Sequence, residues 1–307
     1  MVMSNLTTFH GKTIKDFSHA GDLTINAGAC PRIRIDWDSD EESQDVLERL
    51  LSQPNANQLE ALVIGSWSGD DSEGAPDEVI KLLASSGDRL PNLKALFIGD
   101  ISADENEISW IHQGDMSSLW ATYPKLEEFG ARGGNDLRLG PLNHSALKKI
   151  VIQTGGMSAE LLGEALAIKA QIEHFEVWLG SENYGASTNV DHFASLFAGE
   201  LFPNLKVLAL RNCEYADDLA ERVATAPIMD RISELDLSKG TLTDRGAKAL
   251  SAGGKLGALD RLVIDHHYLT DAGLAELRLS TKMLIEGKQL KPDSYGGEEH
   301  YYIAVSE

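Results

Sequence analysis

Three things are scarce in this sequence: cysteine, basic residues and long apolar stretches. The 307 residues include 2 cysteines, Cys30 and Cys213, so no disulfide framework is expected. No stretch approaches the roughly 18 consecutive apolar residues of a membrane-spanning helix, and residues 1–17 lack the apolar core of a signal peptide. We therefore expect a cytoplasmic protein without a membrane partner.

The shortage of basic residues leaves a large negative charge. Lys and Arg number 27 against 48 Asp and Glu, which gives a formal net charge of −21. Such a field repels phosphates, so we expect no nucleic-acid partner, and it favours solubility and basic partners. Hydrophobic residues, in contrast, make up 42% of the chain, which is enough for a sizeable core.

A repeating apolar pattern runs through most of the chain. Residues 232–250 and 259–277 match at an offset of 27 residues, and both end in Leu-Thr-Asp-x-Gly-x-x-x-Leu. Their first halves read apolar-x-x-Leu-x-apolar. The same strand pattern begins at Leu59, Leu93, Leu126, Leu147, Ile172, Leu205, Ile232 and Leu259. This is the leucine-rich-repeat pattern, with periods at and above the long end of its range.

The pattern predicts a fold. In Leu-x-Leu the two apolar residues point to one face of a short strand, and residues 78–90 and 159–170 have helical spacing. The Leu-Thr-Asp-x-Gly segments place a Thr or Asp where a helix needs an N-cap. Stacked strand–turn–helix units give a parallel sheet with outer helices, and their ends need caps. We predict a single α/β horseshoe: an N-terminal cap (1–57), repeats (58–282) and a C-terminal cap (283–307).

In the C-terminal cap, apolar side chains alternate at Tyr301, Ile303 and Val305. This alternation predicts a final strand that covers a sheet edge.

The chain resembles the leucine-rich-repeat superfamily, nearest its ribonuclease-inhibitor-like branch, through the segments 242–250 and 269–277. The segments GDISADENEISWI (99–111), EVWLG (176–180) and YIAVSE (302–307) resemble a family of bacterial cytoplasmic leucine-rich-repeat proteins without an assigned activity. That resemblance implies a bacterial origin and work beside an enzyme system encoded nearby. It supplies no catalytic residue.

The repeat register also predicts a surface. With the first apolar residue of each repeat at position one, positions four and six face the core, and positions three, five and seven face the concave side. Position eight lies at its rim. The predicted partner-binding residues on this side and its rim are Arg132, Gln153, Glu176, Trp178, Arg211, Asp236, Asp265 and His266.

Trp and Arg dominate binding hot spots, and Trp178 and Arg211 lie on neighbouring strands where they can stack. Two roles are open for the arginines of this face. They hold an acidic group of a partner, or they neutralise Glu176 and Asp236 within the chain.

Asp265, His266 and His267 stand in a row that could hold a metal. His267, however, falls at position nine, a structural column that also contains Cys213, so we expect it to point inward while Asp265 points outward. We predict no metal, no cofactor and no catalytic residue.

Residues 107–111 (EISWI) lie outside the repeat register. They form either a functional loop or a segment packed through Ile108, Trp110 and Ile111. We favour packing.

The sequence thus predicts a non-enzymatic scaffold that binds a protein or peptide through its concave face. One alternative is an acidic horseshoe that inhibits a basic enzyme. Another is an accessory subunit of a bacterial enzyme system, which would bring clustered titratable groups or a bound cofactor.

Overall fold

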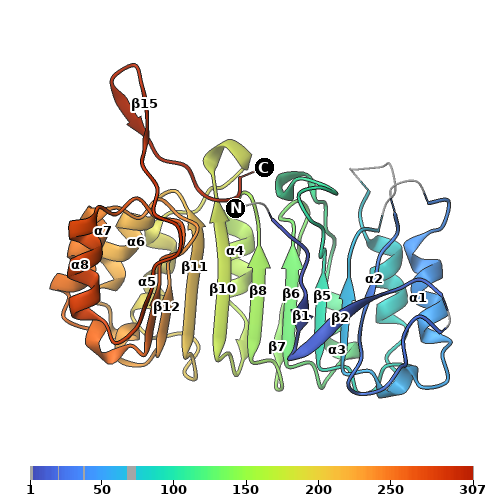
Figure 1. Cartoon of the computed structure of the whole chain (residues 1–307). Coiled ribbons are helices and arrows are strands. Elements are labelled where there is room, and N and C mark those ends of the chain that lie inside the picture. Colours follow the sequence, from blue (N-terminus) through green and yellow to red (C-terminus); the bar gives the residue numbers. More distant parts are fainter. Residues whose placement is uncertain (1–2, 20, 37–38, 68–73, 307) are drawn as a thin grey trace. The chain divides into compact units, whose positions relative to one another are not determined.

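The computed structural model describes residues 3–306 except residues 20, 37–38 and 68–73. These residues form two compact units. The N-terminal unit contains residues 3–153 and 167–170, and the C-terminal unit contains residues 154–166 and 171–306. Each unit is a mainly parallel sheet with helices beside it (Figure 1). The single-domain organisation with caps at 1–57 and 283–307 stays a prediction.

The N-terminal unit is built on strands that follow one another in chain order. Its sheet is formed by β1 (Thr8–Phe9), β2 (Lys12–Phe17), β3 (Cys30–Ile33), β4 (Ala61–Ile64), β5 (Ala95–Ile98), β6 (Glu128–Arg132) and β8 (Lys149–Gln153). β1 is antiparallel to β2, and the later pairings are parallel. Its helices are α1 (Ser43–Leu51), α2 (Asp77–Ala84) and α3 (Ser117–Thr122). A separate parallel pair joins β7 (Asn143–His144) to β9 (Lys169–Ala170).

The C-terminal unit repeats the same plan. Its parallel sheet contains β10 (His174–Gly180), β11 (Val207–Cys213), β12 (Glu234–Asp236), β13 (Arg261–Val263) and β14 (Leu284–Ile285). Its helices are α4 (Ala159–Leu166), α5 (Ala194–Phe197), α6 (Ala216–Val223), α7 (Asp244–Ala252) and α8 (Asp271–Ser280), of which α6, α7 and α8 pack side by side. A hairpin of β15 (Asp293–Tyr295) and β16 (Glu298–His300) projects from this unit (Figure 1).

The strand pairing confirms the predicted register, because equivalent repeat positions lie side by side. At position five, Val63 pairs with Phe97, and Glu176 pairs with Ala209. Positions four and six form the core between sheet and helices, with exposures of 1% or less at Leu62, Ile64, Leu96, Ile98, Leu208, Leu210, Leu235 and Leu262. We call the opposite side, which carries positions three, five and seven, the helix-free face.

The Leu-Thr-Asp-x-Gly segments start helices as predicted. Thr243 and Thr270 are the N-cap residues of α7 and α8, and their hydroxyls accept hydrogen bonds from the backbone N–H groups of Arg245 and Gly273. The helices predicted from spacing end earlier than expected. Residues 78–90 contribute α2, which stops before Ser85-Ser86-Gly87, and residues 159–170 contribute α4, which stops before the short strand β9.

The N-terminal residues cover the helix-free face of their own unit. The chain that leads into β1 crosses this face (Figure 1). The Phe9 ring packs edge-on against Phe97, with ring centroids 5.9 Å apart. Cys30, Val63 and two alanines complete this buried cluster. In the N-terminal unit the face predicted to receive a partner is therefore occupied by the chain itself.

The C-terminal residues correct one expectation. Ile303 and Val305 are buried, as their alternation predicts, but no strand forms within the described residues 301–306. They cross the end of β11 and the turns that follow β12 and β13 instead, as their hydrogen bonds show. The sheet is extended by β14, which pairs with β13.

Candidate functional site

A cluster of charged side chains lies on the helix-free face of the C-terminal unit. We call it the charged cluster, and its members are His174, Glu176, Trp178, Arg211, Asp236 and Lys239. Four of them were predicted from the sequence to bind a partner. His174 and Lys239 were not, although they stand at positions three and eight of their repeats, which the register places on the same side and at its rim.

Arg211 is the centre of the cluster. Its Nη1 donates to Glu176 Oε1 at 3.0 Å, and its Nε donates to Ser238 Oγ at 2.9 Å and lies 3.4 Å from Asp236 Oδ2. Of the two roles left open by the sequence, neutralisation of Glu176 and Asp236 is the one that these contacts show. The Arg211 side chain is still 22% exposed, so the cluster is reachable from solvent.

Trp178 holds the cations in place. Its indole N–H donates to Glu176 Oε1 at 2.9 Å. The guanidinium of Arg211 lies 5.4 Å from the ring centroid and the ammonium of Lys239 lies 5.0 Å from it, both within cation–π range. The predicted stacking of Trp178 and Arg211 is confirmed. Trp178 is only 5% exposed, so its main role here is to orient the charged groups.

The two carboxylates of the cluster have opposite pKa directions. Burial raises the pKa of Glu176, but the hydrogen bond with His174 and the charge of Arg211 outweigh it and lower that pKa to about 2. Burial also raises the pKa of Asp236, and here Arg211 does not overcome it. The guanidinium therefore compensates Glu176 more fully than Asp236, and a further cation beside Asp236 would be favourable.

Asp265 and His266 contact the chain that follows them. Asp265 Oδ1 accepts from the backbone N–H of Lys288 at 2.7 Å, and a Cβ at Gly287 would collide with this carboxylate. His266 Nε2 donates to the carbonyl oxygen of Tyr302 at 2.9 Å. Both predicted residues thus lie in the C-terminal unit but bind the chain's own backbone.

Arg132 and Gln153 lie in the N-terminal unit and are 3% and 7% exposed. Arg132 Nε donates to Gln153 Oε1 at 2.8 Å, and its Nη1 donates to the carbonyl oxygens of Ile101 at 2.7 Å and Ser4 at 3.2 Å. The guanidinium of Arg132 thus binds the N-terminal chain at Ser4 and the chain after β5 at Ile101.

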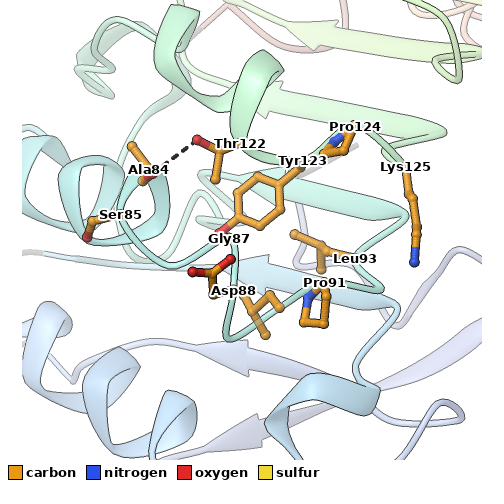
Figure 2. Close-up of a pocket in the computed structure, with 11 residues that line it drawn as sticks. Ala84, Ser85, Gly87, Asp88, Pro91, Leu93, Thr122, Tyr123, Pro124 and Lys125 are labelled. Atoms are coloured by element: carbon orange, nitrogen blue, oxygen red, sulfur yellow. Dashed lines mark hydrogen bonds between the residues drawn. The ribbon is translucent and has the colours of Figure 1, made fainter.

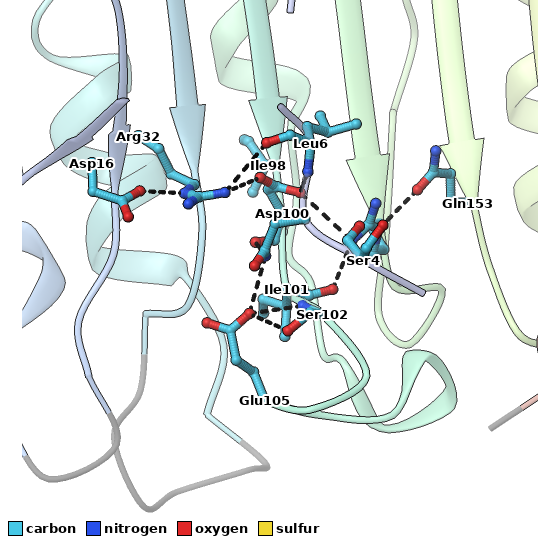
Figure 3. Close-up of polar contacts among 12 residues, drawn as sticks. Ser4, Leu6, Asp16, Arg32, Ile98, Asp100, Ile101, Ser102, Glu105 and Gln153 are labelled. Carbon is cyan, nitrogen blue, oxygen red and sulfur yellow. Dashed lines mark hydrogen bonds and ion pairs between the residues drawn. The ribbon is translucent and has the colours of Figure 1, made fainter. Parts of the chain in front are cut away.

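The same network contains a fully buried carboxylate, which sequence reasoning missed. Asp100 accepts from the backbone N–H of Leu6 at 2.8 Å and from Arg32 Nη1 at 2.9 Å (Figure 3). Its side chain is 0% exposed. Because nothing in the repeat pattern marks residues 4–6 as its partners, this site could not be predicted from spacing.

Column nine has the structural character expected from the sequence. His267 is 0% exposed, and its Nδ1 accepts from the backbone N–H of Leu269 at 3.1 Å. Burial raises the pKa of the Cys213 thiol well above its ordinary value and that of Cys30 to about 12, so both are poor nucleophiles. In the described part of the chain, no three His, Cys, Asp or Glu side chains are grouped to hold a metal ion.

The segment 107–111 packs only in part. Ile108 and Ile111 are buried, but Trp110 is 51% exposed, contrary to the packing expected for it. The chain forms a short 3-10 helix at Ile108–Trp110, which turns the indole outward.

The N-terminal unit has a surface pocket on its helix side, with a volume of about 440 Å³ (Figure 2). It lies between the residues after α2 and the end of α3. Its walls are partly fixed by Thr122 Oγ1, which donates to the carbonyl oxygen of Ala84 at 3.0 Å, and by the Tyr123 hydroxyl, which donates to that of Leu83 at 2.7 Å. These groups are already paired, so the pocket offers little chemistry to a ligand.

Comparison with known proteins shows the fold and no activity. No family model and no curated protein matches the chain. A solved structure of a Bacteroides fragilis protein from a structural genomics project is 25% identical, covers 90% of this chain and 76% of its own, and superposes with a TM-score of 0.75. An internalin from Listeria monocytogenes is 15% identical over 76% of this chain and 56% of its own, with a TM-score of 0.35, too low to support an argument. No helix among the described residues is long and apolar enough to cross a membrane.

Proposed function

We propose that this chain is a non-enzymatic cytoplasmic scaffold of the leucine-rich-repeat, ribonuclease-inhibitor-like type, and that it binds a protein or peptide through the helix-free face of its C-terminal unit. The horseshoe curvature and the concave character of this face belong to the same proposal.

The observation that carries the proposal is the charged cluster. Its side chains are ordered by one another before any partner arrives, which lowers the entropic cost of binding. Burial raises the pKa of its carboxylate Asp236 despite the charge of Arg211, and Asp265 stands at position seven of the next repeat. A partner that brings an Arg or Lys side chain to Asp236 would complete the pairing. The net charge of −21 would attract such a partner over a longer range.

The inhibitor alternative uses the same chemistry with a basic enzyme as the target, so the two differ only in the effect on that target. The accessory-subunit alternative would place an enzyme's own subunit on this face. Arg132 and Gln153 have no part in the proposal, because Arg132 is bonded to the backbone of residues 4 and 101 and to the side chain of Gln153.

The test is affinity purification from the native host with three baits: wild type, the double variant Trp178→Ala plus Arg211→Ala, and the control Arg245→Ala. Arg245 lies on α7, and its side chain is 54% exposed. The proposal predicts that the double variant loses a basic partner which the wild type and the control retain.

Because removal of Arg211 leaves Glu176 buried without its cation, the baits are first compared by thermal unfolding. Asp236→Asn, which keeps the side-chain shape, replaces the double variant if that protein is unfolded. A double variant, or an Asp236→Asn variant, that is folded and retains every wild-type partner would rule the proposal out.

A further inference from the structure

The last described residues of the chain lie across the end of β11 and the turns that follow β12 and β13. The side-chain amide of Asn212, near the end of β11, forms two hydrogen bonds with the backbone of Val305: its Nδ2 donates to the carbonyl oxygen, and its Oδ1 accepts from the N–H at 3.0 Å. In the turn after β12, the carbonyl oxygen of Lys239 accepts from the N–H of Ala304 at 2.8 Å. We call residues 302–305 the tail segment.

The turn after β13 binds the other end of the tail segment. His266 Nε2 and the Tyr268 hydroxyl both donate to the carbonyl oxygen of Tyr302 at 2.9 Å. The N–H of Tyr302 in turn lies 2.9 Å from the Tyr268 oxygen, which accepts from it. All of these contacts involve backbone atoms of the tail segment, so they would form with other side chains at the same positions.

Side chains of the tail segment add a simple pattern. Ile303 and Val305 are 8% and 4% exposed, whereas Tyr302 is 57% exposed. The receiving residues therefore bind the backbone of the tail segment, and β-branched side chains are buried at alternate positions of it. In recognition of this kind, backbone hydrogen bonds give affinity and side-chain pockets give selectivity.

The receiving residues share an unusual backbone conformation. Asn212, Lys239 and His266 stand at position eight of three consecutive repeats, and their φ angles are 53°, 67° and 63°. This left-handed region disfavours residues with a side chain. Gly133, at the same position of a repeat in the N-terminal unit, has a φ of 106° and needs no such exception. Strained residues of this kind gather where a ligand is held.

The tail segment is connected to the rest of the unit through an exposed hairpin, so it can dissociate without disrupting the sheet. The preceding hairpin of β15 and β16 is exposed, and its turn is Gly296-Gly297, where a Cβ would meet nothing within 4 Å. The N-terminal residues contrast with this: β1 is part of a sheet, and Leu6 is bound by a fully buried carboxylate. They belong to the fold, whereas the tail segment makes no strand pairing within the described residues.

From these contacts we propose that the end of β11 and the turns after β12 and β13 form a binding site for a peptide, and that the tail segment is its tethered occupant. The external ligand is a segment of a partner protein that adopts the same backbone path, with β-branched side chains at alternate positions, as in Ile303 and Val305. This inference does not depend on the charged cluster binding a partner.

The experiment uses the full chain with a protease recognition sequence inserted between Gly296 and Gly297. After cleavage, release of the C-terminal fragment is followed by gel filtration, and rebinding is followed with a fluorescently labelled synthetic peptide of residues 297–306. We expect the peptide to rebind to cleaved wild type, and Asn212→Ala to weaken this binding about tenfold or more. Asn204→Ala, an exposed asparagine of the same unit, is the matched control and should bind as wild type does.

A chemical variant of the peptide makes the test independent of the stability of Asn212→Ala. N-methylation of Val305 replaces the amide hydrogen that is donated to Asn212 Oδ1 by a methyl group. We expect it to weaken binding to wild type about tenfold. The same conclusion is supported if the cleaved C-terminal fragment remains bound to wild type but dissociates from Asn212→Ala in gel filtration.

Three results would overturn the proposal. One is a cleaved protein that loses its cooperative thermal transition, because the tail segment would then be a fixed part of the fold. Another is a peptide affinity that changes neither with N-methylation of Val305 nor with Asn212→Ala. The third is a dimer of the uncut chain that disappears in Asn212→Ala, since the external occupant would then be the tail segment of a second copy and not a partner protein.

Discussion

Glu176 and Asp236 stand at the same repeat position on β10 and β12, and both contact the guanidinium of Arg211. Their environments nevertheless act in opposite directions: the pKa of Glu176 is about 2, whereas that of Asp236 is raised by burial. Arg211 lies between the two carboxylates and does not offset their burial equally, although Lys239 adds a second cation to the cluster. This difference is what makes Asp236 the residue through which we expect a basic partner to be recognised.

The lowered pKa of Glu176 predicts an acid-sensitive contribution to stability. The ordinary pKa is 4.5, and the folded value is about 2. The stabilisation is therefore fully present above pH 4.5 and is lost as the pH falls from 4.5 toward 2. It amounts to about 3 kcal/mol at neutral pH.

Urea unfolding of wild type and Glu176→Gln between pH 6 and pH 2.5 measures this contribution. We expect wild type to lose more free energy of unfolding over this window than the variant, which is already less stable at pH 6. The matched control Glu160→Gln removes an exposed carboxylate from α4. Equal losses in wild type and Glu176→Gln would show that Glu176 gains nothing from its ionised state.

At the scale of the element, the Leu-Thr-Asp-x-Gly segments link one repeat to the next. Asp217 Oδ1 accepts from the backbone N–H groups of Thr243 at 2.8 Å and Gly246 at 3.1 Å. One repeat further on, Asp244 accepts from the backbone N–H and the hydroxyl of Thr270. A carboxylate of one helix thus caps the next helix, and the glycine of the motif leaves room for it.

The glycine of this motif gives a prediction at the element scale. A Cβ at Gly246 would lie 2.5 Å from Asp217 Oδ1, so Gly246→Ala should displace the carboxylate and cost about 1–3 kcal/mol. The control is Gly163→Ala in α4, where a Cβ meets nothing within 4 Å and alanine should stabilise by about 0.5–1 kcal/mol. Thermal or urea unfolding distinguishes them, and equal effects of the two substitutions would contradict this account of the motif.

Elements also show the limits of prediction from spacing. The caps Thr243 and Thr270 follow from local chemistry, and they are where the sequence places them. The exposed Trp110 does not follow, because a hydrophobic side chain outside the repeat register gives no indication of its direction. The predicted helices extend past the observed ends at Ala84 and Leu166, because helical spacing continues beyond the residues at which each helix stops.

At the scale of the molecule, what repeats is predictable and what occurs once is not. Strand register follows from the period, because each repeat pairs with its neighbours. The contacts of Leu6 with Asp100 and of Val305 with Asn212 span 94 and 93 residues, and they join the repeats to segments that lie outside the repeat pattern. A single sequence therefore predicts the helix-free face but not the chain segments that cover parts of it.

The central claim is that the C-terminal unit recognises a basic partner through Asp236. The most direct test selects random displayed peptides on the wild-type chain and measures their affinities by calorimetry for wild type, Asp236→Asn and Asp218→Asn. Asp218 lies on α6, so its variant makes the same change of net charge away from the cluster. We predict that selected peptides are rich in Arg or Lys and bind Asp236→Asn about tenfold more weakly, a loss of about 1.4 kcal/mol, with affinity for Asp218→Asn unchanged. Equal affinities for both variants, or selected peptides without basic residues, would contradict the claim.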